Sequence, residues 1–278
     1  MGRFTQKKRV AAIGILSAPM PNHHLHRAAS YVERAYVRWV ELSGALAVVI
    51  PYNTKHLQQY LASVDSVVFC GGSIENDATH SAAQYRKYMS VFRAVYDYAV
   101  RRNRTPGGYF PLWGTCQGFE LLALMGDPPK PNHFYETMDA VPKHGLSILA
   151  FQGPSRFRRL FTGAERGKLA AVPSCTHAHD LGFRTGSDVA RRMQAYLDAV
   201  SVDRTDDGAE FINMFAYKDL PFYGSIWHVE RPTNDLSELT AQRFSEFLRK
   251  ESEKSAKRPK ALRLAREPLS SAETVLLT

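Results

Sequence analysis

The sequence Trp113-Gly114-Thr115-Cys116-Gln117-Gly118 decides how the middle of this chain folds. An apolar run that ends at Leu112 precedes it, and a second apolar run, Phe119 to Met125, follows it. This order predicts a strand, a sharp Gly-x-Cys-x-Gly turn and a helix, the layout of a nucleophile elbow, in which glycines relieve the steric cost of the turn. The amide hydrogens and the dipole of the helix N-terminus would favour the thiolate over the thiol. The pattern therefore favours a nucleophilic Cys116 over an inert buried cysteine.

A nucleophilic cysteine needs a base, and the segment Phe222 to Glu230 contains one. We expect this segment to be a short apolar strand that ends in His-x-Glu. Because residues two apart in an extended chain point to the same side, Glu230 would lie beside His228 and orient its ring. The other ring nitrogen could then take the proton of Cys116. His-x-Glu alone is a weak signal, and its position after the elbow strengthens it.

Several segments together resemble the γ-glutamyl hydrolases, the folylpoly-γ-glutamate carboxypeptidases of peptidase family C26 in the class I glutamine amidotransferase-like superfamily. Phe110 to Glu120 matches the family's Phe-Pro-x-Trp-Gly-Thr-Cys-x-Gly-Phe-Glu, of which generic amidotransferases share only the Gly-x-Cys-x-Gly core. Phe69 to Ser73 matches a Phe-x-Gly-Gly-Ser segment after the third strand. Glu210-Phe211-Ile212 and Tyr223 to Glu230 match the end of the domain. The resemblance extends over roughly residues 10 to 250.

The resemblance implies catalytic roles for particular residues. Cys116 would be the nucleophile and His228 its general base and acid, with Glu230 beside the histidine. The oxyanion hole would be formed by the Gly71-Gly72 turn and the backbone N–H of Gln117, which would stabilise charge that develops in the tetrahedral transition state. No metal and no organic cofactor would be required.

The resemblance also implies substrate-binding residues. Tyr36 falls where the family carries a tyrosine near the reaction centre, although a core aromatic on an amphipathic helix explains it equally well. His177 matches a second histidine that lines the substrate cleft, but His179 lies two residues later and the alignment is loose there. Glu120, which ends the elbow match, completes the substrate-binding set.

The chain departs from the family pattern at three places. Val229 replaces the proline of the usual Gln-Trp-His-Pro-Glu, so the backbone between base and orienting carboxylate is freer. Cys70 replaces a common proline before the Gly-Gly turn, and the segment Cys175 to Asp180 diverges most. The chemistry is therefore better defined by the sequence than the substrate preference.

The apolar periodicity along the chain predicts an α/β fold with a mostly parallel sheet between helices, a three-layer arrangement of the flavodoxin-like kind. Cys116 would lie at the carboxyl edge of that sheet, where such folds bind ligands. After Gly126 the pattern becomes irregular, as expected for an inserted region that forms a cleft. The expected strands are 10–16, 45–50, 67–70, 110–113, 210–217 and 222–227, and the expected helices are 28–43, 56–64 and 85–99.

Length and composition predict one hydrolase domain, residues 10–252, between a basic segment, residues 1–9, and a basic, disordered tail, residues 253–278. With 278 residues and 44% hydrophobic residues the chain can bury one substantial core. The net charge of +9 is concentrated near the C-terminus without interleaved aromatic residues, which argues against a nucleic-acid site. The three cysteines suggest no disulfide framework, although a Cys70–Cys175 bridge is conceivable. His23, His24 and His26 lack a carboxylate or cysteine at ligand spacing, so a surface loop is expected there.

Localisation and partners follow mainly from the resemblance. Family members work in lysosomes, in vacuoles or outside the cell, whereas the start of this chain does not match an intact signal peptide, so a cytoplasmic location also stays open. No apolar run is long enough for a membrane span. The expected partners are a folylpoly-γ-glutamate or another γ-glutamyl substrate and a second copy of the chain in a homodimer, with neither nucleic acid nor membrane.

The motifs and the resemblance together thus imply a cysteine hydrolase that cleaves γ-glutamyl bonds, with folate poly-γ-glutamates as the expected substrate. Two alternatives stay open. One is a hydrolase of small γ-glutamyl amides or an ammonia-transferring glutamine amidotransferase, which would need a synthetase partner. The other is an inactive homologue that binds glutamyl ligands, against which the intact Cys116, His228 and Glu230 argue.

Overall fold

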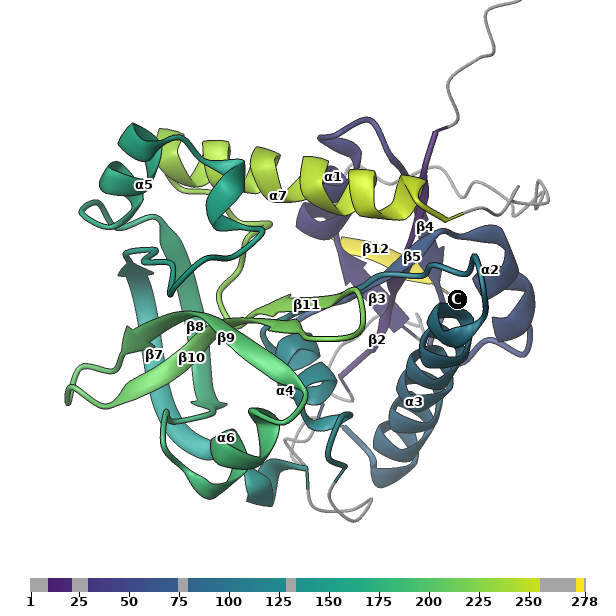
Figure 1. Ribbon diagram of the computed structural model, residues 1–278. Coiled ribbons are helices and arrows are strands. Elements are labelled where there is room, and N and C mark those ends of the chain that lie inside the picture. The colour runs from purple at the N-terminus through teal and green to yellow at the C-terminus, as the bar shows by residue number, and fades with distance from the viewer. Residues whose placement is uncertain (1–9, 22–29, 75–79, 129–133, 256–273, 278) are drawn as a thin grey trace, which may run out of the picture.

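A computed structural model of the chain describes residues 10–21, 30–74, 80–128, 134–255 and 274–277, and a seven-stranded sheet forms its centre (Figure 1). The first five strands in the sheet order run parallel, the sixth is antiparallel to the fifth, and the seventh is antiparallel to the sixth. In spatial order the strands are β4 (Leu46–Ile50), β1 (Ala12–Leu16), β5 (Ser66–Phe69), β6 (Leu112–Thr115), β11 (Phe222–Ser225), β10 (Glu210–Tyr217) and β9 (Leu197–Arg204).

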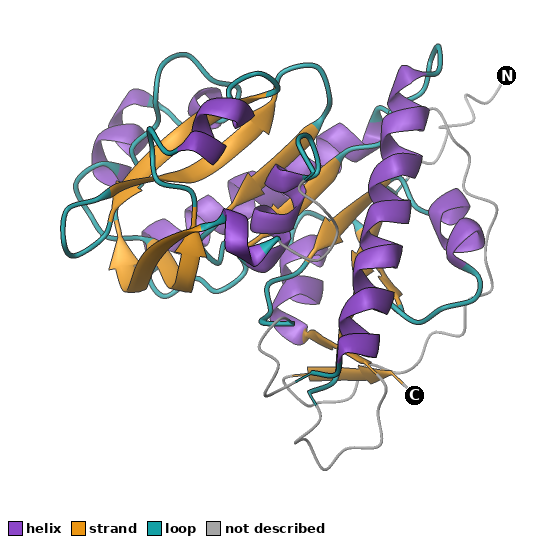
Figure 2. Cartoon of the chain, turned by 90° about the horizontal axis from the view of Figure 1, so that it is seen from below, coloured by secondary structure: helices purple, strands orange, loops and turns teal. Residues whose placement is uncertain are grey.

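Helices cover both faces of this sheet (Figure 1, Figure 2). One face carries α1 (Arg34–Glu41) and α7 (Asp235–Glu253), and the other carries α2 (Leu57–Ser63), α3 (Ala82–Arg104) and α4 (Gln117–Leu124). The alternation of side chains along each strand supplies both cores. In β5, Phe69 stacks on Phe92 of α3 with ring centroids 3.8 Å apart, whereas Val68 belongs to the core under α1 and α7. The predicted three-layer α/β fold is confirmed.

The region after Gly126 is more regular than expected. It contains an antiparallel pair, β7 (Asp139–Ser147) and β8 (Cys175–Gly182), together with the short helices α5 (Gly163–Leu169) and α6 (Asp188–Met193). In β8 the buried and exposed residues alternate, which is the pattern of a strand with one covered face. Two 3₁₀ turns, Tyr135–Thr137 and Arg158–Leu160, complete this region.

The predicted helix over residues 28–43 is wrong in its first part. Residues Ser30–Glu33 form strand β3, which pairs with β2 (Ala18–Pro19), and α1 begins only at Arg34. The side chains of Ser30 and Val32 are buried, whereas those between and after them are half-buried. This period of two overrides the helical spacing that the apolar residues suggested, because backbone pairing in a sheet satisfies the N–H and C=O groups of this segment.

The expectation of a disordered tail is also wrong at its end. Residues Thr274–Leu277 form strand β12, which pairs antiparallel with β3 so that Thr274 lies opposite Glu33. The end of α7 is also tied to the sheet, since the hydroxyl of Ser252 donates to Ser66 at 2.7 Å. The basic segment 1–9 and the histidines His23, His24 and His26 lie outside the described residues. All three cysteines are free thiols, so the conceivable Cys70–Cys175 bridge is absent.

The two glycines of the elbow allow backbone segments to approach closely. A Cβ atom on Gly114 would lie 2.3 Å from the carbonyl oxygen of Gly118. A Cβ atom on Gly118 would lie 2.3 Å from the carbonyl oxygen of Phe69 in β5. Both neighbours are backbone atoms that cannot move aside, so these glycines hold α4 directly against β5 and β6.

We therefore expect Gly118→Ala to destabilise the fold by about 1–3 kcal/mol, the usual cost of an overpacked core. Gly167→Ala in α5 is the matched control. No heavy atom lies within 4 Å of its added Cβ, and alanine gains about 0.5–1 kcal/mol over glycine inside a helix. Urea unfolding monitored by circular dichroism measures both changes. Equal stability of the two variants would contradict the close-approach argument.

Candidate functional site

Three neighbouring parallel strands deliver the predicted catalytic segments to one edge of the sheet. Gly71 follows β5, Cys116 follows β6 and His228 follows β11. Because the carboxyl ends of adjacent parallel strands lie side by side, these segments converge. A Cβ atom placed on Gly71 would lie 3.1 Å from Cys116 Cβ, 3.1 Å from His228 Cε1 and 3.0 Å from the hydroxyl of Tyr36. The structure thus brings together four of the residues that the sequence singled out.

Cys116 sits in a strained backbone conformation at the start of α4. Its φ of 51° and ψ of −117° make it the one non-glycine residue with positive φ among those described, a strain that is typical of functional sites. Its N–H donates to the carbonyl of Ser225 at 3.0 Å, which ties the turn to β11. Its Sγ lies 3.9 Å from the carbonyl oxygen of Ala178 in β8. The predicted elbow geometry is present.

His228 and Glu230 occupy a turn rather than the end of a strand, so the expected extended geometry is wrong. Strand β11 ends at Ser225, and the N–H of Arg231 donates to the carbonyl of His228 at 3.2 Å. The predicted pairing nevertheless forms, because Nδ1 of His228 lies 2.6 Å from Oε1 of Glu230. The N–H of His228 also donates to the carbonyl of Thr176 at 2.8 Å. Strand β8 therefore fixes the turn from the other side.

The surroundings of His228 keep its ring protonated. Burial lowers the pKa of this histidine, but the negative charge of Glu230 and hydrogen bonds to Cys116 and Glu230 outweigh it and raise the pKa to about 10. The side chain of Glu230 is fully buried, so its charge is poorly screened. At neutral pH the site therefore holds an imidazolium beside the sulfur.

The predicted oxyanion hole is partly occupied in this state. The N–H of Gly71 donates to the hydroxyl of Tyr36 at 2.7 Å. The N–H of Gln117 belongs to the first residue of α4 and has no partner within that helix. The Gln117 side chain donates to the hydroxyl of Tyr135 and lies next to Gly72. Burial, then the charge of Glu230, holds the pKa of Tyr36 well above its usual range, so its hydroxyl keeps a proton to donate.

His177 lies in a buried polar cluster. Its Nδ1 is 2.9 Å from Nε2 of His179, while its Nε2 is 2.8 Å from the hydroxyl of Ser147 and 3.2 Å from a carboxylate oxygen of Asp203. Both ring nitrogens are therefore engaged, and only 2% of the residue is exposed. Direct contact with a substrate would require one of these bonds to break. The side chain of Glu120, on α4, is also buried.

The residues that support the turn of His228 and Glu230 were not predicted from the sequence. Arg231 forms an ion pair with Glu33 and lies 3.8 Å from Oε1 of Glu230. The hydroxyl of Thr176 donates to the carbonyl of Arg231 at 3.0 Å. The position of Arg231 directly after His-x-Glu was visible in the sequence, but its partner Glu33 lies 198 residues earlier. No local pattern could have paired them.

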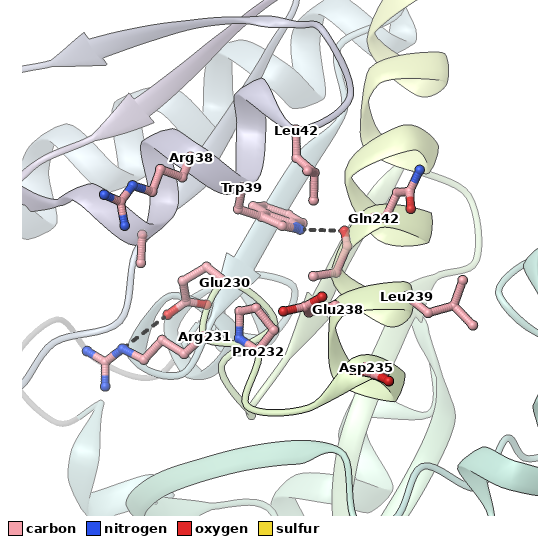
Figure 3. A pocket seen from close by; sticks show the side chains of 12 residues that line it. Arg38, Trp39, Leu42, Glu230, Arg231, Pro232, Asp235, Glu238, Leu239 and Gln242 are labelled. Atoms are coloured by element: carbon pink, nitrogen blue, oxygen red, sulfur yellow. Dashed lines mark hydrogen bonds and ion pairs between the residues drawn. The ribbon is translucent and has the colours of Figure 1, made fainter.

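A cavity of about 720 Å³ borders the same turn (Figure 3). It lies between α1 and α7, and Trp39, Glu230, Arg231 and Gln242 are among its lining residues. Cys116 and His228 do not line it. The cavity is therefore behind the orienting carboxylate and separate from the space around the sulfur.

Comparison with known proteins agrees with this geometry. Residues 11–130, which include the elbow, match the family model Peptidase C26. The human gamma-glutamyl hydrolase is 27% identical over 231 residues, which cover 82% of this chain and 69% of the human protein. Gamma-glutamyl hydrolase B of Dictyostelium discoideum is 26% identical over 228 residues, 79% of this chain. The chain is thus similar to the γ-glutamyl hydrolases, and its first half matches the Peptidase C26 model. The match spans only 62% of the Dictyostelium protein's length.

Solved structures with the same fold also match this chain. A protein from Thermoplasma acidophilum that is described as a GMP synthase subunit has a TM-score of 0.52 and 15% identity to this chain, and the alignment covers 89% of this chain and 99% of that one. PurLQS from Thermotoga maritima aligns with a TM-score of 0.52 and 14% identity over 86% of this chain and 98% of that one. The fold is therefore glutamine amidotransferase-like.

Two kinds of feature are absent from the described residues. None of the helices in that part of the chain combines the length and the apolarity of a membrane span. Within the same residues no group of three or more histidine, cysteine, aspartate and glutamate side chains is arranged to hold a metal ion.

The three cysteines should differ in reactivity. Burial, with the nearby charges of Glu230 and Glu33, raises the pKa of Cys70 well above its usual range, and burial with the charge of Asp203 does the same for Cys175. Cys116 faces the imidazolium of His228 instead. Iodoacetamide at neutral pH should therefore label Cys116 first, because alkylation follows thiolate content. Peptide mass spectrometry of a time course measures the order. Equal labelling of all three cysteines would remove Cys116 as the activated thiol.

Proposed function

We propose that this protein is a cysteine hydrolase that cleaves γ-glutamyl amide bonds, with folate poly-γ-glutamates as the preferred substrates. The observation that carries the proposal is the convergence of Cys116 and a carboxylate-paired His228 on Gly71 at the carboxyl edge of the sheet. The family match and the names of the relatives support the γ-glutamyl bond as the target.

In the first half of the reaction the thiolate of Cys116 attacks the carbonyl carbon of the γ-glutamyl amide. The carbonyl oxygen becomes an oxyanion, which the N–H of Gln117 and the hydroxyl proton of Tyr36 would stabilise. His228 then donates its proton to the leaving nitrogen as the C–N bond breaks. The γ-glutamyl group remains on sulfur as a thioester, and the amine departs.

In the second half His228, now neutral, removes a proton from water. The hydroxide attacks the thioester carbon, the C–S bond breaks, and the thiolate is restored with the carboxylic acid as product. Glu230 pairs with Nδ1 of His228 and holds its ring in one orientation. Every step uses groups of the protein and one water molecule.

For the substrate set we propose a direct role for Tyr36 and indirect roles for the two buried residues. Tyr36 lies against both Cys116 and His228 around Gly71. His177 is hydrogen-bonded on both ring nitrogens, so it would act by fixing His179 rather than by touching the substrate. Glu120, buried in the first turn of α4, would support the elbow.

Removal of the sulfur or of the base should stop turnover of a pentaglutamyl folate. We expect Cys116→Ala to abolish the reaction, because the thioester has no other acceptor atom. His228→Asn should cost on the order of 10²-fold or more, the scale of lost proton transfer. Mass spectrometry of the products measures turnover and also shows which γ-glutamyl bond is cut. Cys175→Ala is the matched control, since that thiol is free and buried and has no part in the proposed mechanism.

The outcomes of this assay separate the alternatives. Activity in Cys116→Ala would contradict the mechanism. Cleavage of glutamine or small γ-glutamyl amides without cleavage of the folate would favour the small-amide hydrolase. Binding of the folate by the wild-type protein without any product would favour an inactive glutamyl-binding homologue.

The charge of Glu230 should set the alkaline limit of activity. His228 must carry a proton to release the leaving amine, so kcat/KM should fall as pH rises through the pKa of about 10. In Glu230→Gln a cause of the raised pKa is removed while burial still lowers it, so the falling limb should move to lower pH. A pH profile of kcat/KM for both proteins tests this. An unmoved limb would show that another group limits the reaction at alkaline pH.

A further inference from the structure

The turn that carries His228 and Glu230 lacks a rigid residue between them. Val229 is free to sample more backbone conformations than a proline would, yet Oε1 of Glu230 stays 2.6 Å from the ring. The other carboxylate oxygen, Oε2, is buried and has no hydrogen-bond partner among the described residues. A buried carboxylate with one satisfied oxygen depends on its backbone for placement. Contacts from outside the turn must therefore hold the backbone that carries the Glu230 carboxylate.

Arg231 makes the contacts that could do so. Its N–H donates to the carbonyl of His228, and its own carbonyl accepts from the hydroxyl of Thr176 in β8. Its guanidinium forms an ion pair with Glu33, and Nε lies 3.8 Å from Oε1 of Glu230. One residue thus ties the turn to β8 through its backbone and to β3 through its side chain.

Glu33 lies on strand β3, which pairs with another strand on each side. Strand β3 lies between β2 and β12 in the three-stranded sheet, and Glu33 pairs with Thr274 at the end where β3 passes into α1. Three residues further on, Tyr36 contacts the reaction centre. The Arg231–Glu33 ion pair therefore joins the two segments that flank the sulfur.

We propose that Arg231 is a positioning residue, and that its ion pair with Glu33 holds the turn so that Glu230 stays against His228. This inference rests on the proposed function, because it assigns to the pair a part in the same chemistry. The outer face of Arg231 borders the cavity between α1 and α7, where Glu238 and Asp235 also lie (Figure 3). Glu33 is nevertheless the carboxylate that pairs with it.

The titration of His228 distinguishes positioning from a simple charge effect. The ionisable groups that act on His228 include Glu230 on the same turn and Cys116 on the elbow. His177 and His179 on β8 are coupled to it by mutual repulsion of their charged forms. Loss of the Arg231 cation would by charge alone make protonation of His228 easier and raise its pKa. Loss of positioning would instead move Glu230 away and lower it.

The experiment is an NMR titration of the full chain with isotope-labelled histidine side chains. The His228 signal is assigned by its absence in His228→Asn. In Arg231→Gln we expect the His228 midpoint to fall by about one pH unit or more, since a partnering carboxylate is worth that much. Glu33→Gln should lower it too, because the freed guanidinium then competes with His228 for Glu230. The double variant should fall no further than the larger single effect, as expected for one coupled unit.

Two controls complete the test. Arg192→Gln breaks a similarly exposed ion pair, with Asp127 at 2.6 Å, away from the site and should leave the midpoint unchanged. Arg231→Lys keeps the charge and should retain part of the effect. An unchanged or raised midpoint in folded Arg231→Gln or Glu33→Gln overturns the proposal. The readout needs no turnover, so a wild-type protein that cleaves no γ-glutamyl bond would refute the proposed function and leave this test intact.

Discussion

The side-by-side ends of β5, β6 and β11 are the constraint on which the site depends. These strands are adjacent and parallel, so the segments that leave them at Gly71, Cys116 and His228 must meet. The approach is close because Gly114 and Gly118 have no side chains, which lets α4 rest on the backbone of β5 and β6. The same packing places Cys116 directly before the first residue of α4. The backbone contacts that pack α4 on the sheet are therefore the same ones that position Cys116.

Much of this could be predicted from local sequence. The elbow was visible because its glycines, cysteine and flanking apolar runs lie within a few residues of one another. The three-layer arrangement of sheet and helices could be predicted because the apolar periodicities of strands and of helices are both local patterns. His228 and Glu230 were paired correctly for the wrong geometric reason, since a turn, and not a strand, places them together.

What could not be predicted depends on contacts between distant segments. Residues 30–33 have helical apolar spacing, but pairing with β2 and β12 makes them a strand. Residues 274–277 follow a highly charged segment, and their pairing with β3 has no local signature. The engagement of Nε2 of His177 requires Ser147 and Asp203 from two other strands. In each case the partner lies tens to hundreds of residues away.

The three buried histidines His177, His179 and His228 differ in their charge. All are buried, and burial disfavours the charged ring in each. For His179, burial and repulsion by His177 and His228 lower the pKa to about 3. For His177, burial outweighs the carboxylate of Asp203, and the pKa is lowered. His228 differs because a fully buried carboxylate lies 2.6 Å from its ring. The site thus keeps one protonated imidazole beside Cys116 and two neutral ones. The position of Glu230 makes His228 the protonated one.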